Sequence, residues 1–203
     1  MNINLPNKIT IGRLVLAVVF FALLSWYDQR SPNPTLLDLC LGIFVVAALT
    51  DALDGYLARR QDQVTSLGRM LDPFVDKVLI CGAFVFFAAD TFVDADNVNV
   101  TGVQAWMVMV ILGRELLVTG LRGFTEARGK AYGAMAFGKL KMLMQSITAA
   151  AILLVVAHVD LGGKSPLLVI KTVLIWLTVI LTALSMLQYL IRSKDILSEA
   201  SRS

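Results

Sequence analysis

The chain has 203 residues, of which 57% are hydrophobic and only 16% are charged. A soluble domain usually contains about 45–50% apolar and about 25% charged residues, so this composition excludes a disordered chain and argues against a soluble globular domain. The net charge is +3 and no basic run exceeds two residues, which argues against a nucleic-acid-binding protein. We therefore expect a membrane protein that does not bind nucleic acid.

Six stretches of the chain are apolar over the length of about 20 residues that a transmembrane helix requires. In chain order they span residues 9–27, 36–58, 70–92, 103–121, 137–158 and 166–191. Proline, glycine, asparagine and aspartate gather between them, as is typical of loops. We predict an all-α polytopic integral membrane protein with six transmembrane helices. Residues 1–203 form a single membrane-embedded domain in this prediction, with a frayed tail at 194–203.

The distribution of lysine and arginine predicts the orientation of these helices. With the amino terminus inside, the inner loops and tails hold eleven basic residues, whereas the outer loops hold only Arg30 and Lys164. The positive-inside rule therefore places both termini in the cytoplasm. An alternative for the first stretch is a signal peptide, because Lys8 and Arg13 precede an apolar run, but no small-x-small cleavage pattern follows Leu24.

The cysteine and histidine content offers little for catalysis or metal binding. Cys40 and Cys81 both lie in apolar runs, so we expect buried small side chains and not a disulfide framework. His158, the only histidine, falls at the outer end of the fifth predicted helix, and a zinc site has too few candidate ligands. A catalytic or metal-binding site in this chain must therefore use polar side chains other than cysteine and histidine.

A group of ionisable side chains lies within or near the predicted helices, towards their cytoplasmic ends. Each costs at least about 2.5–3.5 kcal/mol to insert at the centre of a membrane, so such residues usually serve a function. They are Arg13, Asp51, Asp54, Asp72, Asp76, Lys77, Arg114 and Glu115. At about 1.5 Å per residue, Arg114 lies about 12 Å inside the helix end near Arg122. The sequence therefore predicts a polar site at the inner membrane face.

The spacing of four aspartates favours a metal site. Asp51 and Asp54 are three residues apart and share a face of one helix, and Asp72 and Asp76 are four apart on the next. A short loop between the two helices would bring both faces together. Four carboxylates in one small volume stay ionised only if cations neutralise them, and oxygen ligands suit Mg²⁺ or Mn²⁺. The alternative is a structural network of salt bridges with neighbouring basic side chains.

Small residues accompany these aspartates. Gly55 and Ala58 follow Asp54 on the same helix, and Gly68 is expected in the loop before Asp72. One small residue alone often only allows two membrane helices to pack closely. Together with the acids, the three small residues indicate that a flat ring or a phosphate group approaches the backbone.

The residues from Asp51 to Asp76 resemble the signature of the CDP-alcohol phosphotransferase family, D-x2-D-G-x2-A-R-x8-G-x3-D-x3-D. All eight fixed positions match within 26 residues, which makes the resemblance highly specific. Residues 5–13 are similar to the amino-terminal entry of the family. Residues 113–122 and 138–145 are similar to the branch that makes phosphatidylglycerophosphate. The resemblance thus extends over most of the chain.

This resemblance implies a fold, a cofactor and roles for the signature residues. Members have six transmembrane helices, usually in a homodimer, and two divalent cations, here Mg²⁺ or Mn²⁺. The implied metal ligands are Asp51, Asp54, Asp72 and Asp76. The implied CDP-binding residues are Gly55, Ala58, Arg59 and Gly68. Asp76 is also the implied general base, and the protein is expected in the bacterial cytoplasmic membrane with its site at the cytoplasmic face.

The predicted reaction joins CDP-diacylglycerol and glycerol 3-phosphate and releases CMP. A phosphate on the acceptor calls for guanidinium and ammonium groups, which bind it through charge-assisted hydrogen bonds. The candidates at the inner face are Arg114, Arg122, Lys139 and Lys141. Arg122 and Lys139 can instead reflect only the positive-inside rule. Glu115 is expected to counter a nearby cation from a helix face different from that of Arg114.

Other functions compete with this prediction. Within the family, the acceptor can be phosphatidylglycerol, as in a cardiolipin synthase, or inositol phosphate or serine. Outside the family, a membrane transporter with an intramembrane cation site would need an inverted repeat, and none is visible in the sequence. A structural helix bundle with ion pairs does not explain the complete signature.

Overall fold

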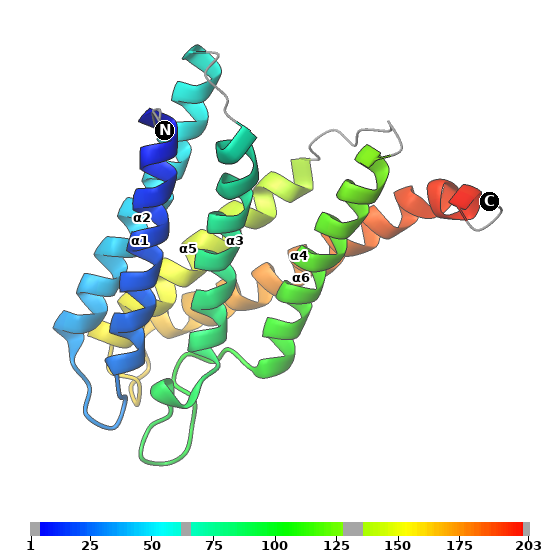
Figure 1. Cartoon of the computed structure of the whole chain (residues 1–203). Coiled ribbons are helices and arrows are strands. Elements are labelled where there is room, and N and C mark those ends of the chain that lie inside the picture. Colours follow the sequence, from blue (N-terminus) through cyan, green and yellow to red (C-terminus); the bar gives the residue numbers. More distant parts are fainter. Residues whose placement is uncertain (1–4, 62–65, 128–135, 201–203) are drawn as a thin grey trace.

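A computed structural model describes the backbone of residues 5–61, 66–127 and 136–200, and side chains at 10–50, 74–125, 138 and 140–191. Its elements, drawn in Figure 1, are α1 (Leu5–Trp26), α2 (Pro34–Gln61), α3 (Ser66–Phe87), the short 3-10 helix η1 (Asp90–Phe92), α4 (Ala105–Ala127), α5 (Ala136–His158) and α6 (Pro166–Ala200). Within these ranges the only β structure is an isolated bridge between Val93 and Asn99. The predicted all-α class is therefore confirmed.

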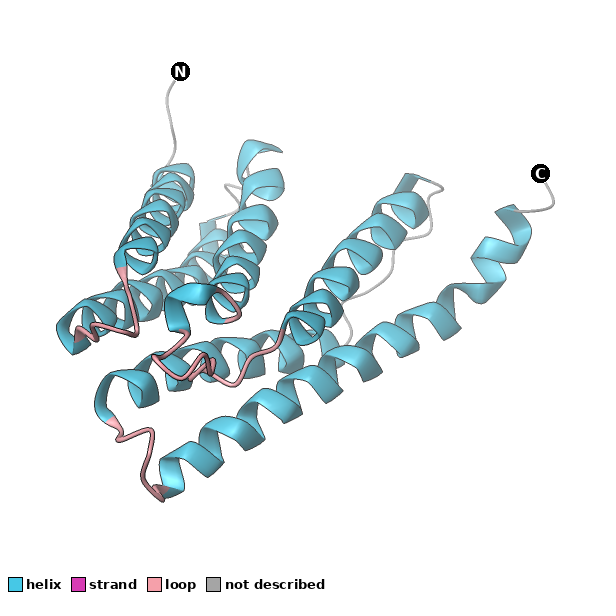
Figure 2. Cartoon of the chain, turned by 90° about the horizontal axis from the view of Figure 1, so that it is seen from below, coloured by secondary structure: helices cyan, strands magenta, loops and turns pink. Residues whose placement is uncertain are grey.

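The helices alternate in direction, so that their ends form two groups (Figures 1 and 2). The connections at 27–33, 88–104 and 159–165 lie at one end, which we call the loop end. α1 begins and α6 ends at the opposite end, which we call the terminal end, together with the end of α2 and the start of α3. α1 packs against α2 and α3, α5 packs against α2 and α6, and α4 packs against α3 and α6.

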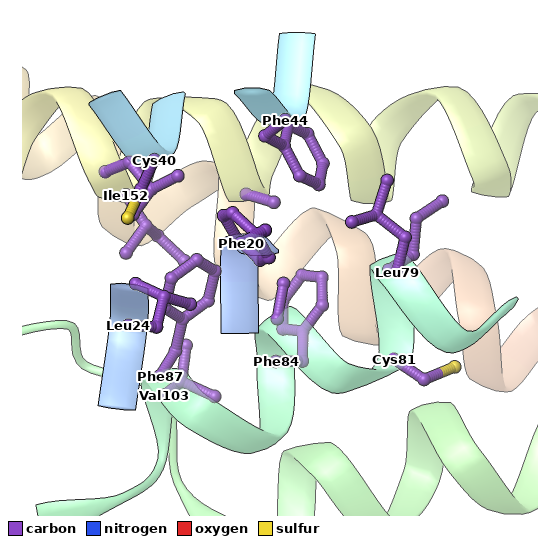
Figure 3. Close-up of a cluster of buried hydrophobic side chains, with 14 of the residues drawn as sticks. Phe20, Leu24, Cys40, Phe44, Leu79, Cys81, Phe84, Phe87, Val103 and Ile152 are labelled. Atoms are coloured by element: carbon purple, nitrogen blue, oxygen red, sulfur yellow. The ribbon is translucent and has the colours of Figure 1, made fainter. Parts of the chain in front are cut away.

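Aromatic side chains from three helices fill the centre of the bundle (Figure 3). Phe20 of α1, Phe44 of α2 and Phe84 of α3 are each at most 1% exposed. The ring centroids of Phe20 and Phe44 are 5.8 Å apart, a separation typical of favourable aromatic pairs. Cys40 and Cys81 are buried free cysteines, as the sequence predicts. This apolar centre holds α1, α2 and α3 together beneath the polar terminal end.

The contact of α1 with α3 depends on a glycine. A Cβ atom at Gly82 would lie 2.3 Å from the ring of Phe21, too close for the ring to stay in place. Phe21 stacks in turn on Phe86, with ring centroids 5.6 Å apart and planes inclined by 9°. Gly82 therefore allows α1 to approach α3 closely, which places polar residues of the two helices within contact distance nearer the terminal end.

The exterior of the bundle is apolar. Large hydrophobic side chains are exposed on every one of the six helices, including Val18, Leu49, Met109 and Leu116. Soluble monomers rarely expose so much apolar surface. Among the described residues, Leu140–His158 and Pro166–Ile191 are long and apolar enough to cross a membrane, whereas the apolar parts of α1 and α2 are shorter. Composition and exposure together indicate a protein associated with a membrane.

The end of α3 differs from the sequence prediction. The apolar run 70–92 predicts a helix to residue 92, but α3 ends at Phe87. The side chains of Asn99 and Thr101 donate hydrogen bonds to the carbonyl oxygen of Phe87, at 2.9 and 2.7 Å. These donors satisfy a carbonyl that the helix end leaves unpaired, and the chain then turns so that Phe92 packs into the core.

The end of α6 also differs. We predicted a frayed tail at 194–203, but α6 continues to Ala200, and only 201–203 lie outside the described residues. Lysine, leucine, glutamate and alanine occur in this stretch, and all have good helix propensity. Neither glycine nor proline interrupts it, so the polar stretch remains helical.

Candidate active site

The predicted signature falls on two consecutive helices at the terminal end. Its first part lies in the last turns of α2, from Asp51 to Arg59, and its second part in the first turns of α3. Gly68 lies in the first turn of α3 and not in the preceding loop, so that prediction is wrong. The helix begins earlier because residues 66–71 include leucine, arginine and methionine, which favour helix.

Seven of the eight signature side chains lie outside the described residues. They are Asp51, Asp54, Gly55, Ala58, Arg59, Gly68 and Asp72. Among the side chains that are described, no group of three or more histidine, cysteine or acidic residues could hold a metal ion. The metal and CDP-binding assignments therefore stay predictions, supported by the placement of their backbones on two antiparallel helices.

Asp76 is the signature residue whose side chain is described, and it points into the bundle. Its Oδ1 forms an ion pair with Nη2 of Arg13 on α1. The Asp76 side chain is 17% exposed and that of Arg13 is 2% exposed. A pocket of about 40 Å³ borders both residues, together with Met142 and Ser146 of α5. The carboxylate is thus fixed between helices and reaches a space large enough for one or two water molecules.

A second polar group lies between α4, α5 and α6. Arg114 of α4 donates through Nη1 to Oε1 of Glu115 at 3.1 Å and through Nη2 to Oγ of Ser185 at 2.8 Å. Lys141 of α5 forms an ion pair with the same glutamate oxygen. Arg114, Glu115 and Lys141 are all buried. Glu115 therefore counters Lys141 as expected, but it also contacts Arg114, because both long side chains turn into the same interior.

Two further cations extend this group. Arg122 of α4 donates through Nη2 to the hydroxyl of Tyr189 on α6 at 2.5 Å. Lys77 of α3 donates to Oγ1 of Thr119 at 2.6 Å and lies within electrostatic range of Arg114 and Arg122. We call Lys77, Arg114, Arg122 and Lys141 the cation cluster. Three helices, α3, α4 and α5, therefore bring four positive charges together.

The charge balance of the cation cluster favours an anionic ligand. Glu115 is the one carboxylate that the described ion pairs place in contact with it. Charges removed from water are costly unless opposite charges compensate them. Arginine and lysine together bind phosphate through directed, charge-assisted hydrogen bonds. A phosphate monoester would supply the missing negative charge.

The structure brings together three of the four predicted acceptor-binding residues. Arg114, Arg122 and Lys141 share the cation cluster, whereas the side chain of Lys139 lies outside the described residues. Sequence reasoning missed Ser185 and Tyr189. A signal was present, because these two polar residues are four apart in the last apolar stretch and so lie on one helix face.

Known proteins of one enzyme family are similar to this chain over most of its length. A family model described as CDP-alcohol phosphatidyltransferase matches residues 3–184. The chain is 36% identical over 160 residues to the CDP-diacylglycerol--glycerol-3-phosphate 3-phosphatidyltransferase of Bacillus subtilis (strain 168), covering 74% of this chain and 77% of that protein. A protein of the same name from Rickettsia bellii (strain RML369-C) is 30% identical over 191 residues, covering 92% of this chain and 93% of the relative. Because the family match spans most of its length, the chain belongs to the CDP-alcohol phosphatidyltransferase family.

Proposed function

We propose that this protein transfers the phosphatidyl group of CDP-diacylglycerol to glycerol 3-phosphate, forming phosphatidylglycerophosphate and releasing CMP. The names of its relatives state this activity for those proteins. The observation that carries the proposal for this chain is the cation cluster, whose buried members Arg114 and Lys141 share the one carboxylate that the described ion pairs provide. An acceptor with a phosphate monoester complements that excess of positive charge.

The possible acceptors differ in charge, and the cation cluster would bind them differently. Serine carries an ammonium group, which the cation cluster would repel. Phosphatidylglycerol carries a phosphodiester with one negative charge, whereas glycerol 3-phosphate carries nearly two at neutral pH. Inositol phosphate is also a monoester, so the charge alone does not separate it from glycerol 3-phosphate. The names of the relatives favour glycerol 3-phosphate.

The donor site of this proposal is formed by the signature on α2 and α3. Asp51, Asp54, Asp72 and Asp76 would hold two divalent cations, Mg²⁺ or Mn²⁺, because four carboxylates form the oxygen-only donor set that such ions prefer. Bound ions would neutralise charge on the pyrophosphate and on the departing CMP. The remaining signature residues, Gly55, Ala58, Arg59 and Gly68, would contact the CDP group.

The protein's own residues position the reacting groups. The acceptor hydroxyl attacks the β-phosphorus of CDP-diacylglycerol, a new phosphorus–oxygen bond forms, and the bond to CMP breaks with its electron pair leaving on CMP. Asp76 would accept the proton of the attacking hydroxyl. Arg13 holds Oδ1 of this carboxylate and so orients it. The cation cluster would hold the acceptor phosphate.

In the membrane, this proposal places six spans with both termini in the cytoplasm. The polar residues at the terminal end and the excess of basic residues in the predicted inner loops favour that orientation. The active site would then open at the cytoplasmic face of a bacterial inner membrane. We also propose a homodimer, as the family resemblance implies.

The test is an acceptor panel with the purified protein and CDP-diacylglycerol. We expect CMP release that depends on glycerol 3-phosphate, with phosphatidylglycerophosphate identified by mass spectrometry. Parallel reactions with phosphatidylglycerol, inositol phosphate and serine should release little CMP. Release with another alcohol but not with glycerol 3-phosphate would overturn the named reaction.

A further inference from the structure

We propose that Tyr189 is a positioning residue that holds Arg114 and Arg122 in place around the acceptor phosphate. This inference rests on the proposed function, because it names what organises the acceptor site. Tyr189 lies on α6 and is 3% exposed. Neither the family signature nor the basic residues of the predicted acceptor site include it.

The geometry places one phenol between two guanidinium groups. The Cζ atom of Arg114 lies 5.5 Å from the centroid of the Tyr189 ring, and that of Arg122 lies 5.4 Å from it. Both distances are within the range of attraction between a cation and an aromatic ring. Nη2 of Arg122 also donates a hydrogen bond to the phenol oxygen at 2.5 Å. Val118 is buried with Tyr189 in a small apolar cluster, which holds the ring in place.

A neutral partner suits this position for an electrostatic reason. A carboxylate here would orient the arginines, but it would also cancel the positive charge that a phosphate needs. The phenol accepts a hydrogen bond and carries no charge, so it orients Arg122 without reducing the charge of the cation cluster. Among the described side chains, Tyr189 is the hydrogen-bond partner of the Arg122 guanidinium. Without this hydrogen bond, the long side chain of Arg122 would be less well fixed in its orientation.

The start of α5 lies close to the same groups. A Cβ atom at Gly138 would lie 3.7 Å from Nη2 of Arg114 and 4.0 Å from the Tyr189 hydroxyl. Gly138 is the third residue of α5, so the backbone there lies near the positive end of that helix. A common region is therefore bordered by the two arginines, the phenol and the start of α5. The arginines and the helix start favour an anion there, and the phenol orients the arginines.

The experiment compares Tyr189→Phe with Tyr27→Phe. Tyr189→Phe removes the hydroxyl that accepts from Arg122 and keeps the ring. We expect the KM for glycerol 3-phosphate to rise about 3- to 10-fold, as for the loss of one hydrogen bond, while the KM for CDP-diacylglycerol stays within about 2-fold. Tyr27 is the matched control, because it is a buried tyrosine at the loop end whose hydroxyl donates to Gln29. Tyr27→Phe should leave both KM values unchanged.

A double-mutant cycle separates positioning from a general structural role. If Tyr189 acts through Arg122, Arg122→Ala alone and Arg122→Ala with Tyr189→Phe should raise the KM for glycerol 3-phosphate equally. Additive effects, an equal rise of both KM values, or a loss of thermal stability with an unchanged KM would each overturn the inference. A wild-type protein that ignores glycerol 3-phosphate would instead overturn the proposed function.

Discussion

Arg114 illustrates how a buried cation can be kept charged and oriented. It lies beside one carboxylate, one hydroxyl and one aromatic ring, contributed by α4 and α6. Among the described side chains that contact the Arg114 guanidinium, only Glu115 carries a negative charge, and it is shared with Lys141. These contacts hold the guanidinium in one orientation, and in our proposal it binds the acceptor phosphate.

Replacing Arg114 tests this role directly. Arg114→Ala should raise the KM for glycerol 3-phosphate about 10- to 150-fold. This range corresponds to a loss of about 1.5–3 kcal/mol, the contribution of one hydrogen bond to a charged group. The KM for CDP-diacylglycerol should change far less, as measured by steady-state CMP release. Lys171→Met is the matched control, because Lys171 is a buried cation at the loop end that donates to the carbonyl oxygen of Val100. An equal effect on both substrates would assign Arg114 to the shared pyrophosphate or to structure.

Replacing Asp76 tests both its proposed role as a metal ligand and its proposed role as the general base. Asp76→Asn should abolish turnover most completely, because it removes both a metal ligand and the proposed base, whereas Asp54→Asn and Asp72→Asn should impair metal binding. A chelator should silence the wild-type protein, and Mg²⁺ or Mn²⁺ should restore CMP release. Asp38→Asn is the control, since Asp38 pairs with His158 at the loop end. Full activity in the chelator would exclude the metal mechanism.

At the scale of elements, α5 and α6 are joined by polar contacts that continue from the cation cluster into the bundle. Gln145 donates to Thr182 at 3.5 Å, and the hydroxyls of Thr148 and Thr178 are 2.7 Å apart. Thr178, Thr182, Ser185 and Tyr189 follow helical spacing along one face of α6. Hydrogen bonds of this kind set the register of helices inside a membrane. The register of α6 in turn places Ser185 and Tyr189 beside the arginines.

The Thr148–Thr178 contact predicts a coupling energy. When one threonine is changed to valine, the hydroxyl of the other keeps only a longer hydrogen bond to a backbone carbonyl oxygen. This distance is 3.3 Å for Thr148 and 3.4 Å for Thr178. We expect each to lower the unfolding free energy by about 0.5–1.5 kcal/mol, with a coupling of about 0.6 kcal/mol in the double variant. Unfolding in mixed micelles measures these values. Thr172→Val, at an exposed site on α6, should have no effect, and strict additivity of the pair would contradict the contact.

At the scale of the whole molecule, the two ends of the bundle differ in chemistry. The aspartate signature lies towards the terminal end, and the cation cluster extends from the middle of α3 and α4 towards that end, whereas the loop end has the connection that contains Phe92 and Thr101. The aromatic centre separates the two. This asymmetry fits the proposal of a reaction site that opens to one side of the membrane.

Labelling of single cysteines tests the orientation. In a background without Cys40 and Cys81, Ala95→Cys and Gly162→Cys should react with an impermeant thiol reagent from outside intact cells. Ser198→Cys should react only after the membrane is opened. Ala95 is chosen over Asn97 because Asn97 has a φ of 59°, which a cysteine would adopt with strain. Reaction of Ser198→Cys in intact cells with protection of Ala95→Cys would reverse the orientation.

The sequence by itself determined the helical class, the approximate positions of six helices and the family signature, because apolar runs and residue spacing are local properties of a chain. It did not determine the end of α3, since the donors at Asn99 and Thr101 reach Phe87 from beyond a turn. It also did not reveal that Glu115 contacts both Arg114 and Lys141, or that Tyr189 lies between two arginines. Those contacts join residues up to 75 positions apart, from Arg114 to Tyr189, and only the packing of α4, α5 and α6 brings them together.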